Sequence, residues 1–203
     1  MDLIQRFIEY LKVERNYSLN TLYAYENDLS DFKDFISKNV GQSKIEKVDY
    51  KIVRSWIIDL SNNQISNRSI NRKISSLKTF YKFLVKTETI DISPLQGHKP
   101  LKQSNKIQVP FSKEEINLLF DQDLFAKDYK GVLQKTIISF FYFTGVRRIE
   151  LINLKSANFN LDSSIIKVMG KRNKERIIPV LPKLKEFLTM YIAVSYTHLR
   201  AHE

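Results

Sequence analysis

The residues best suited to chemistry in this chain are cationic, and they fall in two short stretches. In residues 144–151 (TGVRRIEL), Arg147 stands at the expected start of a helix, directly after a long apolar helix. In residues 170–176 (GKRNKER), Lys171 stands near the tip of an expected hairpin. Guanidinium and ammonium groups donate charge-assisted hydrogen bonds to phosphate and carboxylate oxygens. The two stretches therefore point to chemistry on an anionic partner.

Several other kinds of chemistry are excluded by the residue types present. The sequence has no glycine-rich P-loop, so nothing indicates the use of ATP. The histidines His98, His198 and His202 do not cluster with acids at metal-ligand spacing, so we expect no metal and no small-molecule cofactor. The absence of cysteine excludes disulfides and thiolate metal sites and favours a reducing compartment. No apolar run approaches the length of a membrane span, and the N-terminus lacks the pattern of a signal peptide.

The charge balance is strongly basic. The 33 Lys and Arg residues outnumber the 22 Asp and Glu residues, which gives a formal net charge of +11. Such a chain favours a nucleic acid, an anionic membrane or an acidic protein as its partner. The alternative is a lysine-rich protein from an AT-rich genome, whose charge serves no partner. The distribution of the charge along the chain distinguishes these cases.

The expected helix over residues 66–86 separates its charges from its apolar residues. One face carries an apolar stripe: Ile70, Ile74, Leu77, Tyr81 and Leu84. The opposite face, half a turn away, carries only cationic and hydroxyl side chains: Arg68, Arg72, Ser75, Thr79, Lys82 and Lys86. A face that serves solubility alone usually mixes charges of both signs. This face therefore favours contact with nucleic-acid phosphates, and a merely solvated face is the alternative.

Apolar spacing predicts the other elements. Three helices are expected before this one, over residues 3–11, 22–36 and 49–60. Residues 92–111 contain three prolines and no acid, and are expected to form a basic linker that either follows a DNA backbone or is simply flexible. A second domain begins at the capping box of Ser112. It is expected to contain a helix over 129–143 with its aromatic residues in the core, a C-terminal cap at Gly145, a short helix over 147–154, strands over 164–168 and 176–180, and a helix from about residue 182.

The pattern T-G-V-R-x-x-E-L, followed by G-K-x-N-K-E-R-x-x-P, resembles the tyrosine recombinase, or phage integrase, family and is most similar to its Xer-type members. Residues 14–25 and 77–84 resemble the core-binding, SAM-like domain of the same family. The resemblance implies a mainly α fold: a four-helix SAM-like domain, then the first half of a mixed α/β catalytic domain that is mostly α with a small antiparallel sheet. The expected division is a core-binding domain (1–91), a basic linker (92–111), a partial catalytic domain (112–193) and a non-native tail (194–203).

The resemblance also implies a reaction, namely site-specific DNA recombination. In the family, a tyrosine hydroxyl attacks a DNA phosphodiester and leaves a 3′-phosphotyrosyl bond and a free 5′-hydroxyl, so no ATP is needed. Arg147 matches the first catalytic arginine, which binds the non-bridging oxygens. Lys171 matches the catalytic lysine, which protonates the leaving oxygen. Glu150 matches an acidic supporting position, and Arg172 departs from the pattern where a glycine usually stands.

The expected partner is double-stranded DNA. The resemblance places Arg72 and Lys73 on a helix that lies against DNA, and the charge pattern extends the set of expected contacts: Arg68, Arg72, Lys73, Thr79, Lys82, Lys174 and Arg176. It further implies a homo- or hetero-tetramer on two DNA sites, in the bacterial cytoplasm with the nucleoid and without a membrane. Chromosome-dimer resolution, mobile-element integration and DNA inversion are all compatible with it.

The C-terminal residues depart from the family pattern, which continues with His-x-x-Arg, a His or Trp, and the nucleophilic tyrosine. Here His198 and Arg200 form His-x-Arg, and Tyr196 precedes them instead of following. The segment also resembles a peptide that recurs at the ends of unrelated predicted proteins. We therefore expect the homology to end near Ala193, and a truncated chain that binds DNA without cleaving it. The alternative is a naturally short, non-catalytic DNA-binding regulator.

Overall fold

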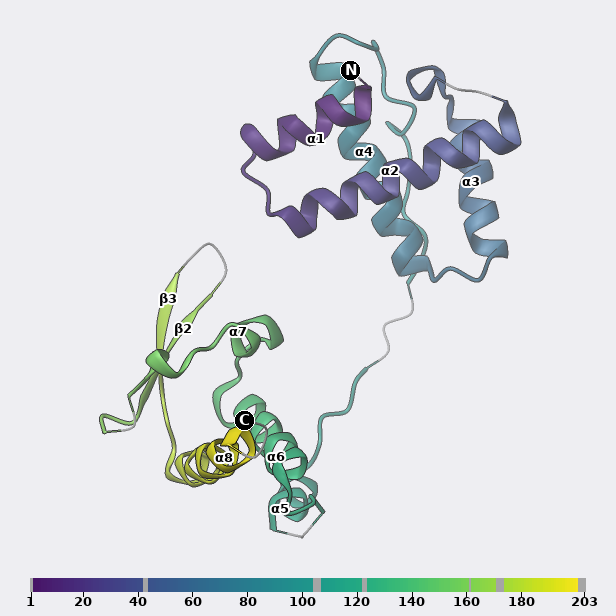
Figure 1. Cartoon of the computed structure of the whole chain (residues 1–203). Coiled ribbons are helices and arrows are strands. Elements are labelled where there is room, and N and C mark those ends of the chain that lie inside the picture. Colours follow the sequence, from purple (N-terminus) through teal and green to yellow (C-terminus); the bar gives the residue numbers. More distant parts are fainter. Residues whose placement is uncertain are drawn as a thin grey trace. The chain divides into compact units, whose positions relative to one another are not determined.

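The computed structural model describes residues 2–41, 44–103, 107–121, 124–160, 162–170 and 174–200, without the side chains of residues 40, 121 and 197–200. The chain divides into two compact units, Met1–Ile107 and Gln108–Glu203, and each is described by itself. The first unit contains four α-helices and a 3₁₀ turn within these residues (Figure 1): α1 (Leu3–Val13), α2 (Leu19–Val40), η1 (Ile45–Lys47), α3 (Tyr50–Asn62) and α4 (Asn67–Lys86).

Local signals in the sequence account for the ends of these helices. The Asp49 carboxylate accepts a hydrogen bond from the Ile52 N–H at 3.0 Å, so it caps α3 as its position predicted. Ser66 caps α4 in the same way, through the Ser69 N–H. At the other end of α2, Gly41 has a φ of 63°, a left-handed conformation that favours glycine.

Helix α4 is the centre of the first unit, since it packs against α1, α2 and α3. All five residues of its predicted apolar stripe are buried: Ile70, Ile74, Leu77, Tyr81 and Leu84. The Tyr81 hydroxyl reaches through this core and donates to the Ile45 carbonyl at 2.8 Å. The opposite, cationic face of α4 is thereby directed away from the core. The predicted separation of the two faces is confirmed.

The start of the expected linker is packed on the first unit. Leu95 is fully buried in the core of that unit. The Asn71 side chain holds the backbone of Leu101 from both sides, donating to its carbonyl at 2.8 Å and accepting from its N–H at 2.9 Å. Asn67 donates to the Lys102 carbonyl at 2.8 Å. Residues 92–103 therefore belong structurally to the first unit, and the compact unit ends at Ile107 instead of residue 91.

The second unit combines helices with a small antiparallel sheet of order β1-β2-β3. Its elements are α5 (Lys113–Asp121), α6 (Tyr129–Thr144), α7 (Arg148–Ile152), η2 (Ser156–Asn158), β1 (Phe159–Asn160), β2 (Ile165–Met169), β3 (Glu175–Pro179) and α8 (Pro182–Arg200). The hairpin β2–β3 is seen in Figure 1, and its register pairs Lys167 with Ile177. Strand β1 was not predicted, because two residues are too few to show a strand's alternation.

The expectation that the aromatic residues of α6 are core residues holds for only part of the helix. Phe140 is buried, whereas Phe141 and Tyr142 are among the exposed large hydrophobic residues. The apolar residues of α6 are not confined to one face, and the helix packs chiefly against α8. Spacing alone cannot reveal which side of such a helix is covered.

Gly131, in the first turn of α6, leaves no room for a side chain. A Cβ added at Gly131 would lie 2.0 Å from the Ala126 carbonyl oxygen, which is backbone and cannot rotate away. We expect Gly131→Ala to destabilise the second unit by about 3 kcal/mol or more. Trp56, the chain's only tryptophan, lies in α3 of the first unit. In urea, the circular-dichroism transition should therefore shift while the Trp56 fluorescence transition stays in place.

Gly97→Ala is the control, because an added Cβ there meets nothing within 4 Å. Gly131→Ala with wild-type transitions by both probes would contradict the packing described for the start of α6.

Candidate functional site

Arg147 stands at a sharp change of direction between α6 and α7. Gly145 ends α6 in the left-handed region (φ 60°), and its N–H donates to the Phe141 carbonyl at 3.0 Å. Val146 is buried and anchors the turn. Arg147 then has extended backbone and is the N-cap residue of α7. Its side chain is 63% exposed, so the guanidinium reaches solvent from a fixed backbone.

Glu150 holds Arg147 in place. Its carboxylate accepts from the Arg147 N–H at 2.9 Å and from Arg147 Nη1 at 2.7 Å. It also accepts from Arg176 Nη2 on β3 at 2.7 Å, and its side chain is only 2% exposed. The hydrogen bond from the Arg147 N–H, and then that from the guanidinium, lower the pKa of the Glu150 carboxyl below its ordinary value. The carboxylate is therefore ionised at neutral pH and shared by two arginines.

The end of the β2–β3 hairpin where the two strands are connected lies beside this carboxylate. The Gly170 N–H donates to the Lys174 carbonyl at 2.8 Å and closes the hairpin. A Cβ at Gly170 would lie 3.6 Å from Glu150 Oε1 and 3.2 Å from the Lys174 carbonyl oxygen. The residue before the predicted catalytic lysine is thus next to Glu150. Lys171 itself and Arg172 lie outside the described residues.

This cluster of Arg147, Glu150 and Arg176 differs from an ordinary surface ion pair. An exposed ion pair at i,i+3 on a helix contributes about 0.2–0.5 kcal/mol to the stability of the helix and does little to fix the orientation of its side chains. Here the carboxylate is buried and bridges a helix start to a strand, and two guanidinium groups against one carboxylate leave a net charge of +1. A guanidinium has five N–H donors in a planar fork. Glu150 binds one of these donors, on Nη1 of Arg147, and the donors that remain are suited to bind an anionic oxygen pair.

The predicted DNA contacts of the first unit have different environments along α4. Arg68 and Lys82 are exposed. The half-buried Thr79 donates its hydroxyl to the Ser75 carbonyl at 2.9 Å. Arg72 is 53% exposed, and its Nη1 pairs with a carboxylate of α2, while Lys73 is only 14% exposed. Arg68, Arg72 and Lys82 thus have groups directed to solvent, and Lys73 is largely enclosed.

Two acids of α2 surround Lys73, and sequence reasoning missed both. Its ammonium contacts Asp28 Oδ1 at 3.3 Å and Asp31 Oδ2 at 2.6 Å. Asp28 directly precedes Leu29, in the apolar register of α2, and a carboxylate at the edge of an apolar stripe signals a buried ion pair. In the second unit, Lys174 is exposed, and Arg176 is turned to Glu150.

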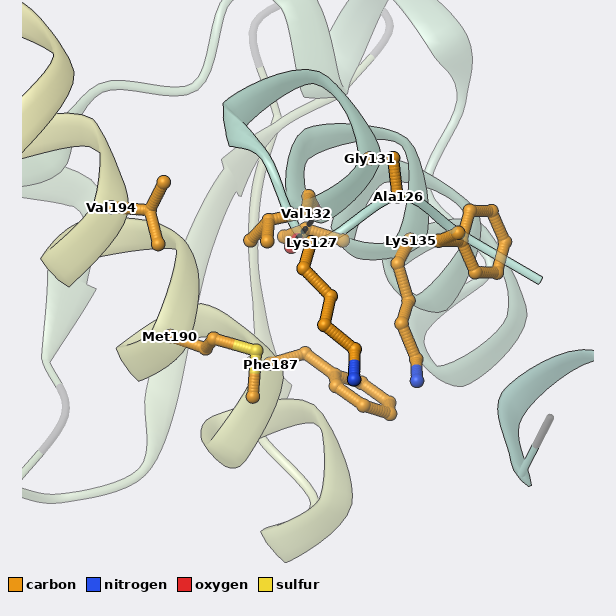
Figure 2. A pocket seen from close by; sticks show the side chains of 10 residues that line it. Ala126, Lys127, Gly131, Val132, Lys135, Phe187, Met190 and Val194 are labelled. Atoms are coloured by element: carbon orange, nitrogen blue, oxygen red, sulfur yellow. Dashed lines mark hydrogen bonds between the residues drawn. The ribbon is translucent and has the colours of Figure 1, made fainter. Parts of the chain in front are cut away.

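The second unit also contains a pocket of about 370 Å³ (Figure 2). Figure 2 shows α8 lining it with Phe187, Met190 and Val194, opposite α6 and the residues before it. Lys135 donates to the Phe120 carbonyl at 2.9 Å and lies 5.0 Å from the centre of the Phe187 ring. The pocket shares no lining residue with the Arg147 cluster, and its mostly apolar wall does not suit a phosphate.

Over the described residues, no helix is both long enough and apolar enough to cross a membrane. The same part of the chain contains no group of three or more His, Asp or Glu side chains placed to hold a metal ion.

The chain matches two sequence models of known domains. Residues 4–88 match the N-terminal SAM-like domain of phage integrases, and residues 111–203 match the phage integrase family. The second match and helix α8 both run past Ala193. Neither marks the expected boundary between the catalytic domain and a non-native tail, and that boundary stays a prediction.

Similar curated proteins and solved structures agree with these matches. Tyrosine recombinase XerC of Staphylococcus epidermidis is 36% identical over 193 residues, 95% of this chain and 64% of that protein. XerC of Pediococcus pentosaceus is 34% identical over 191 residues, 94% of this chain and 64% of that protein. The chain thus spans about 64% of the length of these relatives.

Two solved structures show the same fold at low identity. The Tn1549 transposon integrase in complex with transposon right end DNA has a TM-score of 0.73 at 17% identity, covering 93% of this chain and 64% of that one. A lambda integrase tetramer bound to a Holliday junction has a TM-score of 0.72 at 14% identity, covering 92% and 54%. The predicted fold class, mainly helical with a small antiparallel sheet and a SAM-like N-terminal domain, is confirmed.

Proposed function

Because the chain belongs to the phage integrase family of tyrosine recombinases, we propose that it acts in site-specific DNA recombination and binds duplex DNA through both units. The observation that carries the proposal is the Arg147 side chain, which is 63% exposed while its Nη1 is bonded to the buried Glu150 carboxylate. A fixed, outward-facing fork of this kind suits the non-bridging oxygens of a phosphodiester.

In the proposed reaction, a tyrosine hydroxyl attacks the scissile phosphorus and the 5′ oxygen leaves. The bond between phosphorus and the 5′ oxygen breaks as the 3′-phosphotyrosyl bond forms, so one phosphate ester bond replaces another. Negative charge grows on the non-bridging oxygens, where Arg147 donates. Lys171 is the proposed general acid that protonates the leaving oxygen. Rejoining is the same exchange in the opposite direction.

Glu150 and Arg176 are proposed to support this site. Glu150 bonds both the backbone and the side chain of Arg147, which limits the guanidinium to one orientation. Arg176 ties the same carboxylate to β3, the strand that follows the Lys171 segment. The cluster therefore links the start of α7 to the hairpin. Such a link keeps two catalytic groups in register on one phosphate.

We also propose that these 203 residues bind DNA without cleaving it. Tyr196 precedes His198 and Arg200, whereas the nucleophilic tyrosine of the family pattern comes last. Recombination, and assembly as a tetramer on two DNA sites, are proposed for a protein that carries the remaining catalytic residues. Its place of action would be the nucleoid in the bacterial cytoplasm.

DNA binding by this chain should depend steeply on salt. The proposed phosphate contacts are five cations, Arg68, Arg72, Lys82, Arg147 and Lys174, since Thr79 donates its hydroxyl to the Ser75 carbonyl. Each neutralised phosphate contributes about −0.9 to the slope of log affinity against log salt, so we expect a slope of roughly −4.5. This slope is measured by fluorescence anisotropy of a labelled duplex at salt concentrations from about 50 to about 300 mM.

The bound complex should be non-covalent, so denaturation should release all of the DNA. An affinity that does not change with salt would rule out the proposed binding through phosphates.

A further inference from the structure

A buried carboxylate also holds an arginine in the first unit. Asp28 on α2 is 1% exposed, and its Oδ2 accepts from Arg72 Nη1 and from the Ser76 hydroxyl, the latter at 2.7 Å. Its Oδ1 accepts from the Lys73 ammonium at 3.3 Å. Three donors from one face of α4 therefore meet on a single carboxylate of α2. A buried carboxylate needs such partners, since leaving its charge unpaired is costly.

The two cations on Asp28 have different freedom. Lys73 is enclosed at 14% exposure and also contacts Asp31, so its charge is used within the protein. Arg72 is 53% exposed, and in the described part of the chain Asp28 is its one charged partner. Two acids and two bases cancel in net charge. Any attraction of a phosphate to this place must therefore come from the orientation of the guanidinium.

The arrangement repeats that of Arg147 and Glu150. In both units an acid with a side-chain exposure of 1–2% holds one terminal nitrogen of an arginine that is more than half exposed. A fork held in this way loses less conformational freedom when it binds a phosphate than a freely rotating side chain does.

We propose that Asp28 is a positioning residue, which fixes the Arg72 guanidinium so that it binds a DNA phosphate. The proposal rests on the DNA-binding function proposed above and adds a residue that makes no contact with DNA. The proposal predicts a change in DNA affinity opposite to the usual one. Removing an acid from a DNA-binding protein normally strengthens binding, because the repulsion of the phosphates falls. Removing Asp28 should weaken binding instead.

The test compares Asp28→Asn with Asp31→Asn in the 203-residue chain. Both changes remove one negative charge from α2 and one partner from Lys73, but only Asp28 holds Arg72. We expect Asp28→Asn to weaken duplex binding about tenfold, the size of a charge-assisted hydrogen bond. Its salt slope should also become about 0.9 shallower, as for one lost phosphate contact. Asp31→Asn should bind as tightly as the wild type or more tightly, with an unchanged slope.

Folding is checked by the fluorescence of Trp56, which lies in the same unit. Asp28→Asn that is folded and binds as well as or better than the wild type overturns the proposal. If that variant does not fold, Arg72→Lys decides, since it keeps the charge but replaces the planar fork by a point charge. Weaker binding with a shallower slope supports the proposal, and wild-type binding overturns it. A wild-type chain that does not bind duplex DNA would instead refute the proposed function itself.

Discussion

Replacing Arg147 with alanine is expected to slow covalent protein–DNA complex formation by about 10²–10³-fold, while duplex affinity falls only a few-fold. The reason is that Arg147 is one of several cations proposed to contact phosphate, and the one proposed to lie where negative charge develops in the transition state. The experiment uses a protein in which this chain is followed by the family's His-x-x-Arg motif and tyrosine. Covalent complexes are counted after denaturation as a function of time.

The structure indicates that this variant folds. Glu150 keeps the hydrogen bond from the backbone N–H of residue 147 and the ion pair with Arg176, so its buried charge stays compensated. Arg148→Ala is the matched control, because Arg148 is exposed one residue further along. It should lower affinity slightly and leave the rate of covalent complex formation intact. Equal effects of the two substitutions would remove Arg147 from the catalytic site.

Much of this site was predictable from the sequence because its signals are local. Gly145, Arg147 and Glu150 lie within six residues, and a glycine cap followed by a helix start fixes their geometry almost alone. The two faces of α4 were likewise readable, since a 3.6-residue period over twenty residues leaves little freedom. In both places the chain's own covalent geometry brings the relevant residues together.

The contacts that bring in a second element were not predicted. Arg72 and Asp28 are 44 residues apart, and no local pattern shows which turn of α2 meets which turn of α4. Arg176 is 26 residues from Glu150. A signal for it did exist: Arg176 pairs with the buried Val168 and shares a strand face with Ile178, so alternation places it inward. The sequence instead led us to expect a DNA contact for Arg176, because a cation is seldom directed to the inner side of a strand.

The burial of Leu95 shows the same limit for domain boundaries. Prolines and the lack of acids made residues 92–111 resemble a linker along their whole length. One leucine in the core and three hydrogen bonds with the Asn67 and Asn71 side chains attach residues 95–102 to the first unit. Composition reports the absence of regular secondary structure, but packing decides where a compact unit ends.

Replacing Glu150 with glutamine should affect both catalysis and the pH dependence of stability. The amide keeps the shape of the carboxylate but has one acceptor oxygen, and its NH₂ group faces the N–H donors of Arg147 and Arg176. The Arg147 fork then loses its fixed orientation. We expect covalent complex formation to fall about 10²-fold, as for a misplaced catalytic group, with little change in duplex affinity.

The pH effect follows from the lowered pKa of Glu150, which the Arg147 N–H causes first and its guanidinium second. A carboxyl whose pKa is lower in the folded state adds stability that is fully present above its unfolded pKa, about 4.3. That stability is lost as the pH falls through the lower, folded value. Below about pH 4, the wild-type second unit should therefore lose stability more steeply than Glu150→Gln does.

Urea unfolding of the 203-residue chain, followed by circular dichroism at several pH values, measures this difference. Glu175→Gln is the control, because Glu175 is exposed and its ion-pair partner, the Lys167 ammonium, is 3.9 Å from its carboxylate. Such a surface pair contributes about 0–1 kcal/mol, so the control should follow the wild-type curve. A Glu150→Gln chain with the wild-type pH curve would mean that the carboxylate does not hold the two arginines in solution. The fixed fork on which the proposed chemistry depends would then have to be held by other groups.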